Sequence, residues 1–482
     1  MFALAKGDWG AALAFHALSP LVFALLLAFT AAAVLRLFRP AFRGRLPAAA
    51  WNSIACIFLA YGAVRMLSGT PACAQAPAAA NGVPPGLFTA GFELRGRFEA
   101  FTGQGFVPGR NDEYYLSRLR FNLGIQPLPW LRFVFQAQDS RAPGYPEPQP
   151  SSAVDPLDLR MGYVEFGRNP KAGWSMRAGR QELIFGEERL AGASNWGNVA
   201  RVFDALRVTW TNPGAQLDWF ASSVVIPDQS AFDRSDMRSR FYGFYSSFRR
   251  LVPGWQVEPY VFWRSEAGYR NELKQRGRLE EATLGIRALG RLPARFDYGL
   301  ETALQTGRAA GAPLSAWAGH FAGGYTLGET GRAPRLQAQF NCASGDDNPR
   351  DGRVKTFDNL FPTNHSFYGI ADRQGWRNMR EATGGIGFPI RDKWRFSADY
   401  HFFWLATVQD ALYFDNGSAF VRNPKATSRR VDDEIDVTAA YQHDAHLSLL
   451  AGYAHILPRA FLKQSTPGGA LSGPYVMWTY RY

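Results

Sequence analysis

The chain has 482 residues, of which 15% are aromatic and 48 are glycine, and its formal charge is +12 at neutral pH. Its three cysteines, Cys56, Cys73 and Cys342, lie far apart, which excludes a disulfide framework and a CxxC metal site. Seven lysines leave 46 arginines among the 53 basic residues, so a surface or channel that carries them favours anionic partners, unless the bias only reflects genome base composition.

Two apolar runs, 11–38 and 47–68, stand at the start of the chain, and each approaches the ~20 residues that cross a bilayer as a helix. The connection between them is basic and contains Arg36, Arg39, Arg43 and Arg45. The positive-inside rule places that connection in the cytoplasm. We expect residues 1–74 to be a two-helix segment that passes or resides in the inner membrane, either cleaved after Ala74 or kept as an anchor, and residues 75–86 to be a linker.

The stretch LAKGDWGAALAFHALSPL, with YGAVRML at the end of the second run, resembles a family of small uncharacterised two-helix membrane proteins. That family shows a CxxCGxTR motif just before the Gly-Asp-Trp turn, where Met1 stands here. The segment is therefore expected to be a truncated fusion or the product of a mis-assigned start. The resemblance implies no activity.

From Leu87 onward the apolar residues recur with a period of two, which is typical of strands. In FELRGRFEAF, Phe92, Leu94 and Phe98 alternate with Glu93, Arg95, Arg97 and Glu99. In SRLRFNLGIQ, Leu119, Phe121 and Leu123 alternate with Arg118, Arg120 and Asn122. One face is therefore rich in aromatic and aliphatic side chains, and the other is rich in charges.

This pattern predicts an all-β fold, an antiparallel transmembrane β-barrel over residues 87–482 that follows two hydrophobic helices. A charged inner face and an apolar outer face suit a water-filled lumen surrounded by outer-membrane lipid, and the chain shows about 18 such runs. It ends in YVMWTYRY, and a terminal strand that closes on Tyr482 resembles the one that the barrel-assembly machinery recognises. The alternative is a secreted sandwich, in which so long an apolar edge would invite aggregation.

Two connected segments, 178–210 and 343–379, carry more specific patterns. The first contains Gly179, Arg180, Gln181, Gly186, Arg189, Leu190, Trp196, Asn198, Arg201, Phe203 and Asp204. The second contains Ser344 to Asp346, Phe357, Asp358, Leu360 to His365, Tyr368, Gly369, Asp372, Trp376 and Asn378. Both segments resemble the alginate-export family of outer-membrane barrels, and the strand pattern resembles it over about residues 90–482.

The resemblance implies a monomeric 18-stranded barrel with an arginine-lined lumen, narrowed by an inward excursion, that exports an anionic polysaccharide such as an alginate-like polyuronate. Arginines in a low-dielectric tube raise the local concentration of anions, which supports this function. A general anion-preferring porin for uptake of small solutes is the alternative. An outer-membrane enzyme is a further alternative. We find no GxSxG or HExxH motif, and we therefore predict that the protein is not an enzyme.

The residues expected to line the path of the anion are Arg95, Arg97, Arg118, Arg120, Arg132, Arg180, Arg189, Arg201, Asp204 and Arg207. The arginines of segment 178–210 could equally form internal ion pairs that hold the constriction. Asp346, Asp347 and Asp351 offer oxygen ligands for Ca²⁺, but their spacing is also plain turn chemistry, so we predict no metal and no cofactor. We expect lipid, an anionic polysaccharide or oligosaccharide and the assembly machinery as partners, and no nucleic acid.

Overall fold

The structure is a computed structural model that describes residues 87–167, 172–271, 275–329, 331–363, 365 and 367–482. The expected two-helix segment 1–74 and the linker 75–86 lie outside these residues. Among the described residues, no helix has the length and apolar character needed to cross a membrane.

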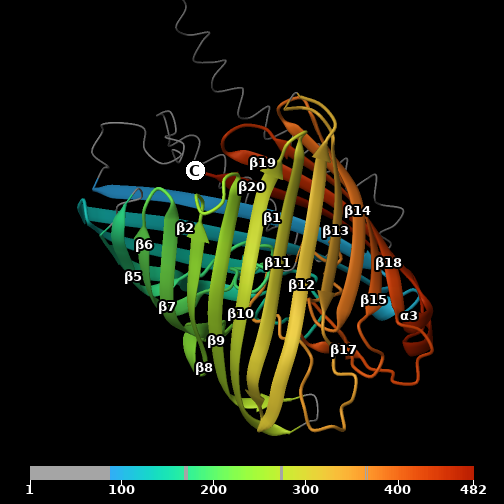
Figure 1. Ribbon diagram of the computed structural model, residues 1–482. Coiled ribbons are helices and arrows are strands. Elements are labelled where there is room, and N and C mark those ends of the chain that lie inside the picture. The colour runs from blue at the N-terminus through green and yellow to red at the C-terminus, as the bar shows by residue number, and fades with distance from the viewer. Residues whose placement is uncertain (1–86, 168–171, 272–274, 330, 364, 366) are drawn as a thin grey trace, which may run out of the picture. The chain divides into compact units, whose positions relative to one another are not determined.

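Eighteen strands form one closed antiparallel barrel (Figure 1), as the alternating pattern predicted. The strands of the barrel are β1 (Phe88–Thr102), β2 (Asn111–Leu128), β3 (Leu131–Arg141), β4 (Asp155–Phe166), β5 (Gly173–Gln181), β6 (Phe203–Thr211), β7 (Ala215–Ile226), β8 (Arg234–Phe248), β9 (Trp255–Arg270), β10 (Arg276–Leu292), β11 (Phe296–Ala309), β12 (Ala312–Thr326), β13 (Arg335–Ala343), β14 (Met379–Ile390), β15 (Trp394–Leu405), β18 (Arg430–Gln442), β19 (Leu447–Pro458) and β20 (Leu471–Arg481). Closure comes from β1 and β20, which pair with Glu93 opposite Arg481.

The strand faces follow the predicted alternation because successive side chains of a strand point to opposite sides. On β2, Leu119 and Phe121 are 44% and 51% exposed, while Arg118 and Arg120 are buried. The apolar residues therefore face outward and the arginines face the lumen. This closed arrangement leaves the barrel without an unpaired edge.

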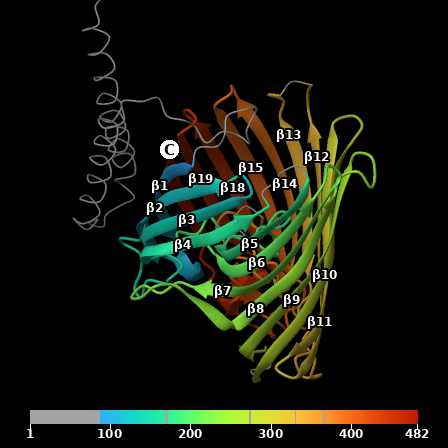
Figure 2. The same cartoon turned by 90° about the vertical axis from the view of Figure 1, so that its left-hand side faces the viewer.

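The two ends of the barrel differ in their connections (Figure 2). The C-terminus lies at the end of the barrel where strands are joined by short turns, such as 129–130, 212–214 and 391–393. We call this end the turn end. The opposite loop end carries the longest connections, which are 182–202 between β5 and β6, 344–378 between β13 and β14, and 406–429 between β15 and β18. The last contains the small hairpin of β16 (Leu412–Tyr413) and β17 (Ala419–Val421).

Part of the hydrophobic core lies inside the barrel, where segment 182–202 packs against inward-facing aromatic residues. We call this segment the first inner loop and segment 344–378 the second inner loop. Phe185 stacks on Phe220 and Tyr245, with ring centroids 5.1 and 5.0 Å apart. Phe361 of the second inner loop meets Phe203 edge-on at 5.5 Å. Burial of these rings stabilises the inner loops within the lumen.

The described part of the chain also contains two short helices. The 3₁₀ helix η1 (Gln104–Phe106) lies between β1 and β2, and α3 (Ala460–Ser465) lies between β19 and β20. Phe106, Phe461 and Leu462 are buried, so both helices are anchored to the barrel by apolar side chains.

Candidate functional site

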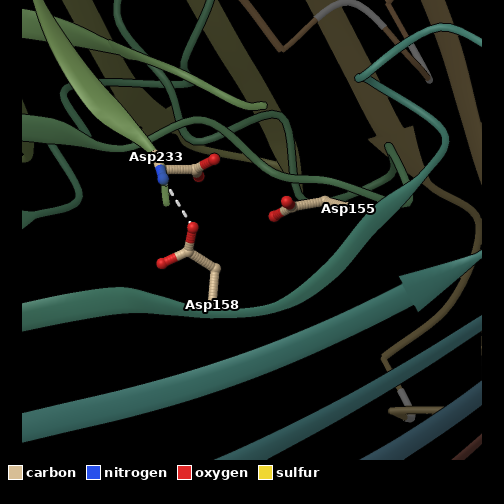
Figure 3. Close-up of side chains that lie close together, drawn as sticks. All are labelled: Asp155, Asp158 and Asp233. Carbon is tan, nitrogen blue, oxygen red and sulfur yellow. Dashed lines mark hydrogen bonds between the residues drawn. The ribbon is translucent and has the colours of Figure 1, made fainter. Parts of the chain in front are cut away.

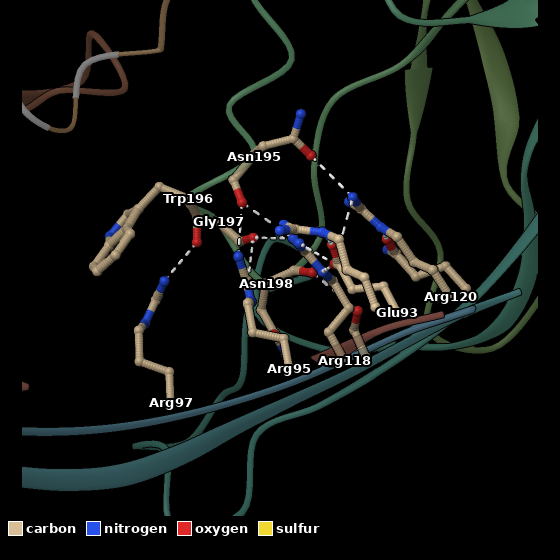
Figure 4. Close-up of polar contacts among 12 residues, drawn as sticks. Glu93, Arg95, Arg97, Arg118, Arg120, Asn195, Trp196, Gly197 and Asn198 are labelled. Atoms are coloured by element: carbon tan, nitrogen blue, oxygen red, sulfur yellow. Dashed lines mark hydrogen bonds and ion pairs between the residues drawn. The ribbon is translucent and has the colours of Figure 1, made fainter. Parts of the chain in front are cut away.

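The first inner loop is held against β1 by two arginines that the alternation had placed in the lumen (Figure 4). Arg95 donates to the backbone carbonyls of Asn195 and Gly197 at 2.7 and 2.8 Å. Arg97 donates to the carbonyl of Trp196 at 2.6 Å. Charge-assisted bonds of this kind are stronger than bonds between neutral groups.

Two arginines of β2 complete this anchor. Arg118 donates to the carbonyl of Asn195 at 3.1 Å and forms a 2.7 Å ion pair with Glu93. Arg120 donates to the side-chain oxygen of Asn195 at 3.0 Å. All four anchor arginines are buried, and their charges are engaged by the loop, by Glu93 and, for Arg97, by Glu99 at 2.5 Å. A direct contact of these four residues with a transported anion stays a prediction.

Asn198 fastens the same loop with its side-chain amide. Its Nδ2 donates to the backbone carbonyls of Ala153, Arg141 and Ser117 at 2.8, 3.0 and 3.2 Å. The backbone carbonyl of Asn198 accepts from Ser140 Oγ at 3.0 Å. The side chain is buried, so these bonds form away from competing water. The asparagine of the Trp-x-Asn pattern therefore has a structural role in the loop.

Arg201 joins the two inner loops to each other. Its Nη1 donates to the carbonyls of Gly192 and Pro362 at 3.1 and 3.0 Å. Burial lowers the pKa of Arg201 to about 10, so the side chain remains charged at neutral pH.

Arg189 makes a similar connection to the second inner loop. It is 2% exposed, and it donates to the hydroxyl of Tyr368 at 3.3 Å. Its guanidinium carbon also lies 4.3 Å from the ring centroid of Phe367, in cation–π contact. The structure therefore places Arg189 and Arg201 among groups that hold the inner loops.

Arg180 and Asp204 were expected to line the path of the anion, and the structure places them on the outer side of β5 and β6 near the loop end. They project from the same side of β5 and β6 as Trp174 and Leu206, which are 60% and 47% exposed, so they face away from the lumen. Arg180 Nε and Asp204 Oδ1 form an ion pair at 2.9 Å. The physical reason is the strict two-residue period of a strand, which puts Arg177, Arg207 and Thr209 inward and this pair outward.

The backbone at Gly179 shows why the Gly-Arg-Gln pattern requires glycine at its first position. Gly179 has a φ of 122°, and a Cβ there would lie 2.3 Å from the carbonyl oxygen of Gly162 on β4. Only glycine permits this close approach of the two strands. This part of the pattern therefore shapes the wall.

Arg207 and Arg132 do face the lumen, toward the turn end. Arg207 pairs with Asp218 at 2.8 Å. Arg132 lies on the inward side of β3 with the buried Gln136, and it has no ion pair among the described residues. The carboxylate opposite it in the ladder, Glu165, is held by another arginine.

Two further arginines, which are not among the predicted site residues, share this environment. Arg291 has the inward parity of the buried Arg287 on β10, and Arg395 has that of the buried His401 on β15. In the described part of the chain neither forms an ion pair. Asp297, opposite Arg291, is held by Arg335 at 2.5 Å. The two-residue alternation was the signal that could have identified both.

Two of the three acidic residues considered for Ca²⁺ lie beside a lysine. The Lys355 ammonium lies 2.6 Å from Asp347 and 2.8 Å from Asp351. Asp346 Oδ1 accepts from the backbone N–H of Asn348 at 3.0 Å, which is turn geometry. These contacts agree with turn chemistry at this position.

Comparison with known proteins relates this barrel to a family and to solved structures of the same fold. Residues 87–470 match the family described as alginate export. A search of curated proteins finds no match. Among solved structures, the chain is similar to Pseudomonas aeruginosa OccK3 (OpdO), with 12% identity, a TM-score of 0.55, and coverage of 82% of this chain and 95% of that one.

Other solved barrels of the same organism give the same result. OpdQ is 11% identical with a TM-score of 0.55 and coverage of 82% and 98%. OccK2 (OpdF), solved in complex with glucuronate, is 11% identical with a TM-score of 0.55 and coverage of 82% and 97%. At this identity the likeness shows the fold, an outer-membrane barrel.

Proposed function

This chain belongs to the alginate export family, and from this premise we propose that it is a passive outer-membrane conduit for export of an anionic polysaccharide of the polyuronate class. In outer-membrane barrels short turns face the periplasm and long loops face the exterior. The turn end is then the entrance and the loop end is the exit.

One observation carries the proposal, namely the surplus of positive charge on the inner wall near the turn end. Arg132, Arg291 and Arg395 face the lumen without an ion-pair partner in the described ranges, and the acids opposite the first two are already held by other arginines. A low-dielectric wall focuses this charge and attracts anions to the entrance. Each contact is weak enough in water to let a chain move on.

The fold also accommodates the chemistry. A barrel of the same fold is known in complex with glucuronate, a sugar carboxylate of the class that a polyuronate repeats. We propose a channel and no enzymatic activity. We further propose that the protein acts as a monomer and that the terminal strand ending at Tyr482 engages the assembly machinery.

Uptake of small anionic solutes is the second candidate. The inner loops occupy part of the lumen, and the cavity beside them measures about 470 Å³. A volume of this size suits a small solute. The direction of flux and the size of the solute therefore distinguish the two functions.

The test uses purified full-length protein in planar bilayers, with polyuronate added on the turn-end side. We expect the polymer to reduce the current. The triple variant Arg132→Ala, Arg291→Ala, Arg395→Ala is expected to raise the half-blocking concentration about tenfold, because each exposed contact between an arginine and a uronate contributes roughly 0.5 kcal/mol. Arg332→Ala is the matched control, since Arg332 lies in a turn at the same end and pairs with Asp392.

Two outcomes contradict the export proposal. One is a half-blocking concentration that is the same in the triple variant and the wild type. The other is free permeation of monomeric uronates with no effect of the polymer, which supports the uptake porin instead.

A further inference from the structure

Three carboxylates meet at the loop end of the barrel, outside the residues predicted to form a site (Figure 3). Asp155 and Asp158 come from the start of β4, and Asp233 immediately precedes β8. One carboxylate oxygen from each lies within 4.8 Å of the others. Strands β4 and β8 are not neighbours in the sheet, so this cluster connects two separate parts of the rim.

Asp155 is the member that points to a ligand. It is 3% exposed, its Oδ1 has no hydrogen-bond partner, and its carboxylate is directed toward Asp158 and Asp233. A buried carboxylate without a partner costs several kcal/mol unless another group compensates it.

Basic residues near the cluster are engaged elsewhere. Arg141 forms an ion pair with Asp139 at 2.7 Å, and Arg180 pairs with Asp204. Arg180 also contacts Asp233, but through the backbone carbonyl at 3.1 Å. Burial, with a contribution from Asp158, raises the pKa of Asp233 to about 6. The described residues provide no ion pair to any of the three carboxylates.

The contacts within the cluster position the remaining oxygens. Asp158 Oδ2 accepts from the backbone N–H of Asp233 at 2.5 Å, and Asp233 Oδ1 accepts from that of Asp228 at 2.9 Å. Asp158 Oδ1 accepts from the N–H of Leu159. Both oxygens of Asp155 and Oδ2 of Asp233 are therefore open to a cation.

We propose that Asp155, Asp158 and Asp233 bind one Ca²⁺ ion that ties the β7–β8 connection to β4. Ca²⁺ takes oxygen ligands at about 2.3–2.6 Å, so two ligands of one ion are at most about 5 Å apart, as these are. Zn²⁺ prefers nitrogen and sulfur ligands, and the cluster holds neither a histidine nor a cysteine. Mg²⁺ requires a tighter octahedral shell and keeps more of its waters.

The ion has a consequence for the proposed exit. Asp155 and Asp233 line the cavity beside the inner loops, together with Arg160 and Arg201. Neutralising the acids there makes the cavity more favourable for an anion. The site itself does not depend on what the channel transports.

The experiment is calorimetric titration of full-length protein, stripped with EDTA, with CaCl₂. The wild type is expected to bind one ion with a Kd at or below about 1 mM, in the range of extracellular Ca²⁺ modules. Asp155→Asn and Asp233→Asn are each expected to weaken binding at least about tenfold, because affinity follows the number of charged ligands. Asp347→Asn is the control, since Asp347 belongs to the lysine-held acidic turn.

A second measurement keeps the test decisive if a variant does not fold. In the wild type, Ca²⁺ is expected to slow proteolysis within segment 227–233, and Mg²⁺ at the same concentration is expected to have a smaller effect. The proposal is overturned if the wild type shows no saturable binding of Ca²⁺, or if folded Asp155→Asn and Asp233→Asn bind it as the wild type does.

Discussion

Arg97 contacts Trp196 in two ways at once. Its guanidinium carbon lies 3.8 Å from the centroid of the indole ring, and its Nη1 donates to the backbone carbonyl of the same residue at 2.6 Å. The indole also stacks on His365, with ring centroids 3.6 Å apart. One arginine of the barrel wall thereby fixes the first inner loop, which in turn contacts the second.

We expect Arg97→Ala to loosen the first inner loop. The change removes a charge-assisted hydrogen bond of about 1.5–3 kcal/mol and a cation–π contact of about 1 kcal/mol, and it also removes the 2.5 Å ion pair of Arg97 with the buried Glu99. Single-channel conductance should rise and the open current should become noisier in planar bilayers. Arg97→Lys keeps the charge without the planar fork and should be intermediate. Equal conductance in all three proteins would contradict an anchoring role.

Asn198→Asp tests the second fastening of the same loop. The substitution preserves size but replaces the donating amide by an acceptor that faces the carbonyls of Ser117, Arg141 and Ala153. Leaving these buried groups unsatisfied costs about 1–3 kcal/mol each. Limited proteolysis of the folded barrel should become faster at 182–202. Asn122→Asp, on the inward face of β2, is the control and should leave the proteolysis rate unchanged.

Gly179→Ala should reduce the thermal stability of the barrel. Its Cβ would approach the carbonyl oxygen of Gly162 to 2.3 Å, so β4 and β5 must move apart. Gly173→Ala is the matched control, because Gly173 also has a positive φ, 113°, but a Cβ there meets nothing within 4 Å. Both variants bear a backbone strain of about 1–3 kcal/mol, and only Gly179→Ala adds the clash. Equal melting temperatures of the two variants would argue against a close approach.

The carboxyl of Asp415 leads us to expect that the stability of the folded protein depends on pH. Burial, with a contribution from Asp372, raises the pKa of Asp415 to about 7, above its ordinary value near 4. The folded state therefore binds the proton more tightly than the unfolded state does. The stability that this provides is fully present below pH 4 and is lost as the pH rises through about 7.

Asp415→Asn should remove this dependence, since the amide stays neutral. From pH 5 to pH 8, the melting temperature of the wild type should fall by at least about 2 °C relative to that of the variant. Parallel curves over this range would show that the Asp415 carboxyl does not titrate in this way. Asp392→Asn, at an exposed turn position, serves as the control.

The faces of the strands were predictable because they depend on a local property. Leu119 and Arg118 are adjacent, and a strand sends adjacent side chains to opposite sides whatever the rest of the chain does. The same argument assigns Arg132, Arg291 and Arg395 to the lumen. The motif resemblance to the alginate-export barrels indicated in addition that segments 178–210 and 343–379 matter for the architecture, and both include the inner loops.

The partner of each charged group was decided only in three dimensions. Arg95 and the carbonyl of Asn195 are 100 residues apart, and the anchor that they form depends on strand register and on the folding of a long loop into the lumen. The meeting of Asp155 and Asp158 with Asp233 depends in the same way on the tertiary structure, because β5, β6 and β7 lie between β4 and β8 in the sheet. Local periodicity shows which side of the wall a charge occupies, whereas long-range packing determines whether that charge anchors a loop, pairs with a neighbour or remains available to a solute.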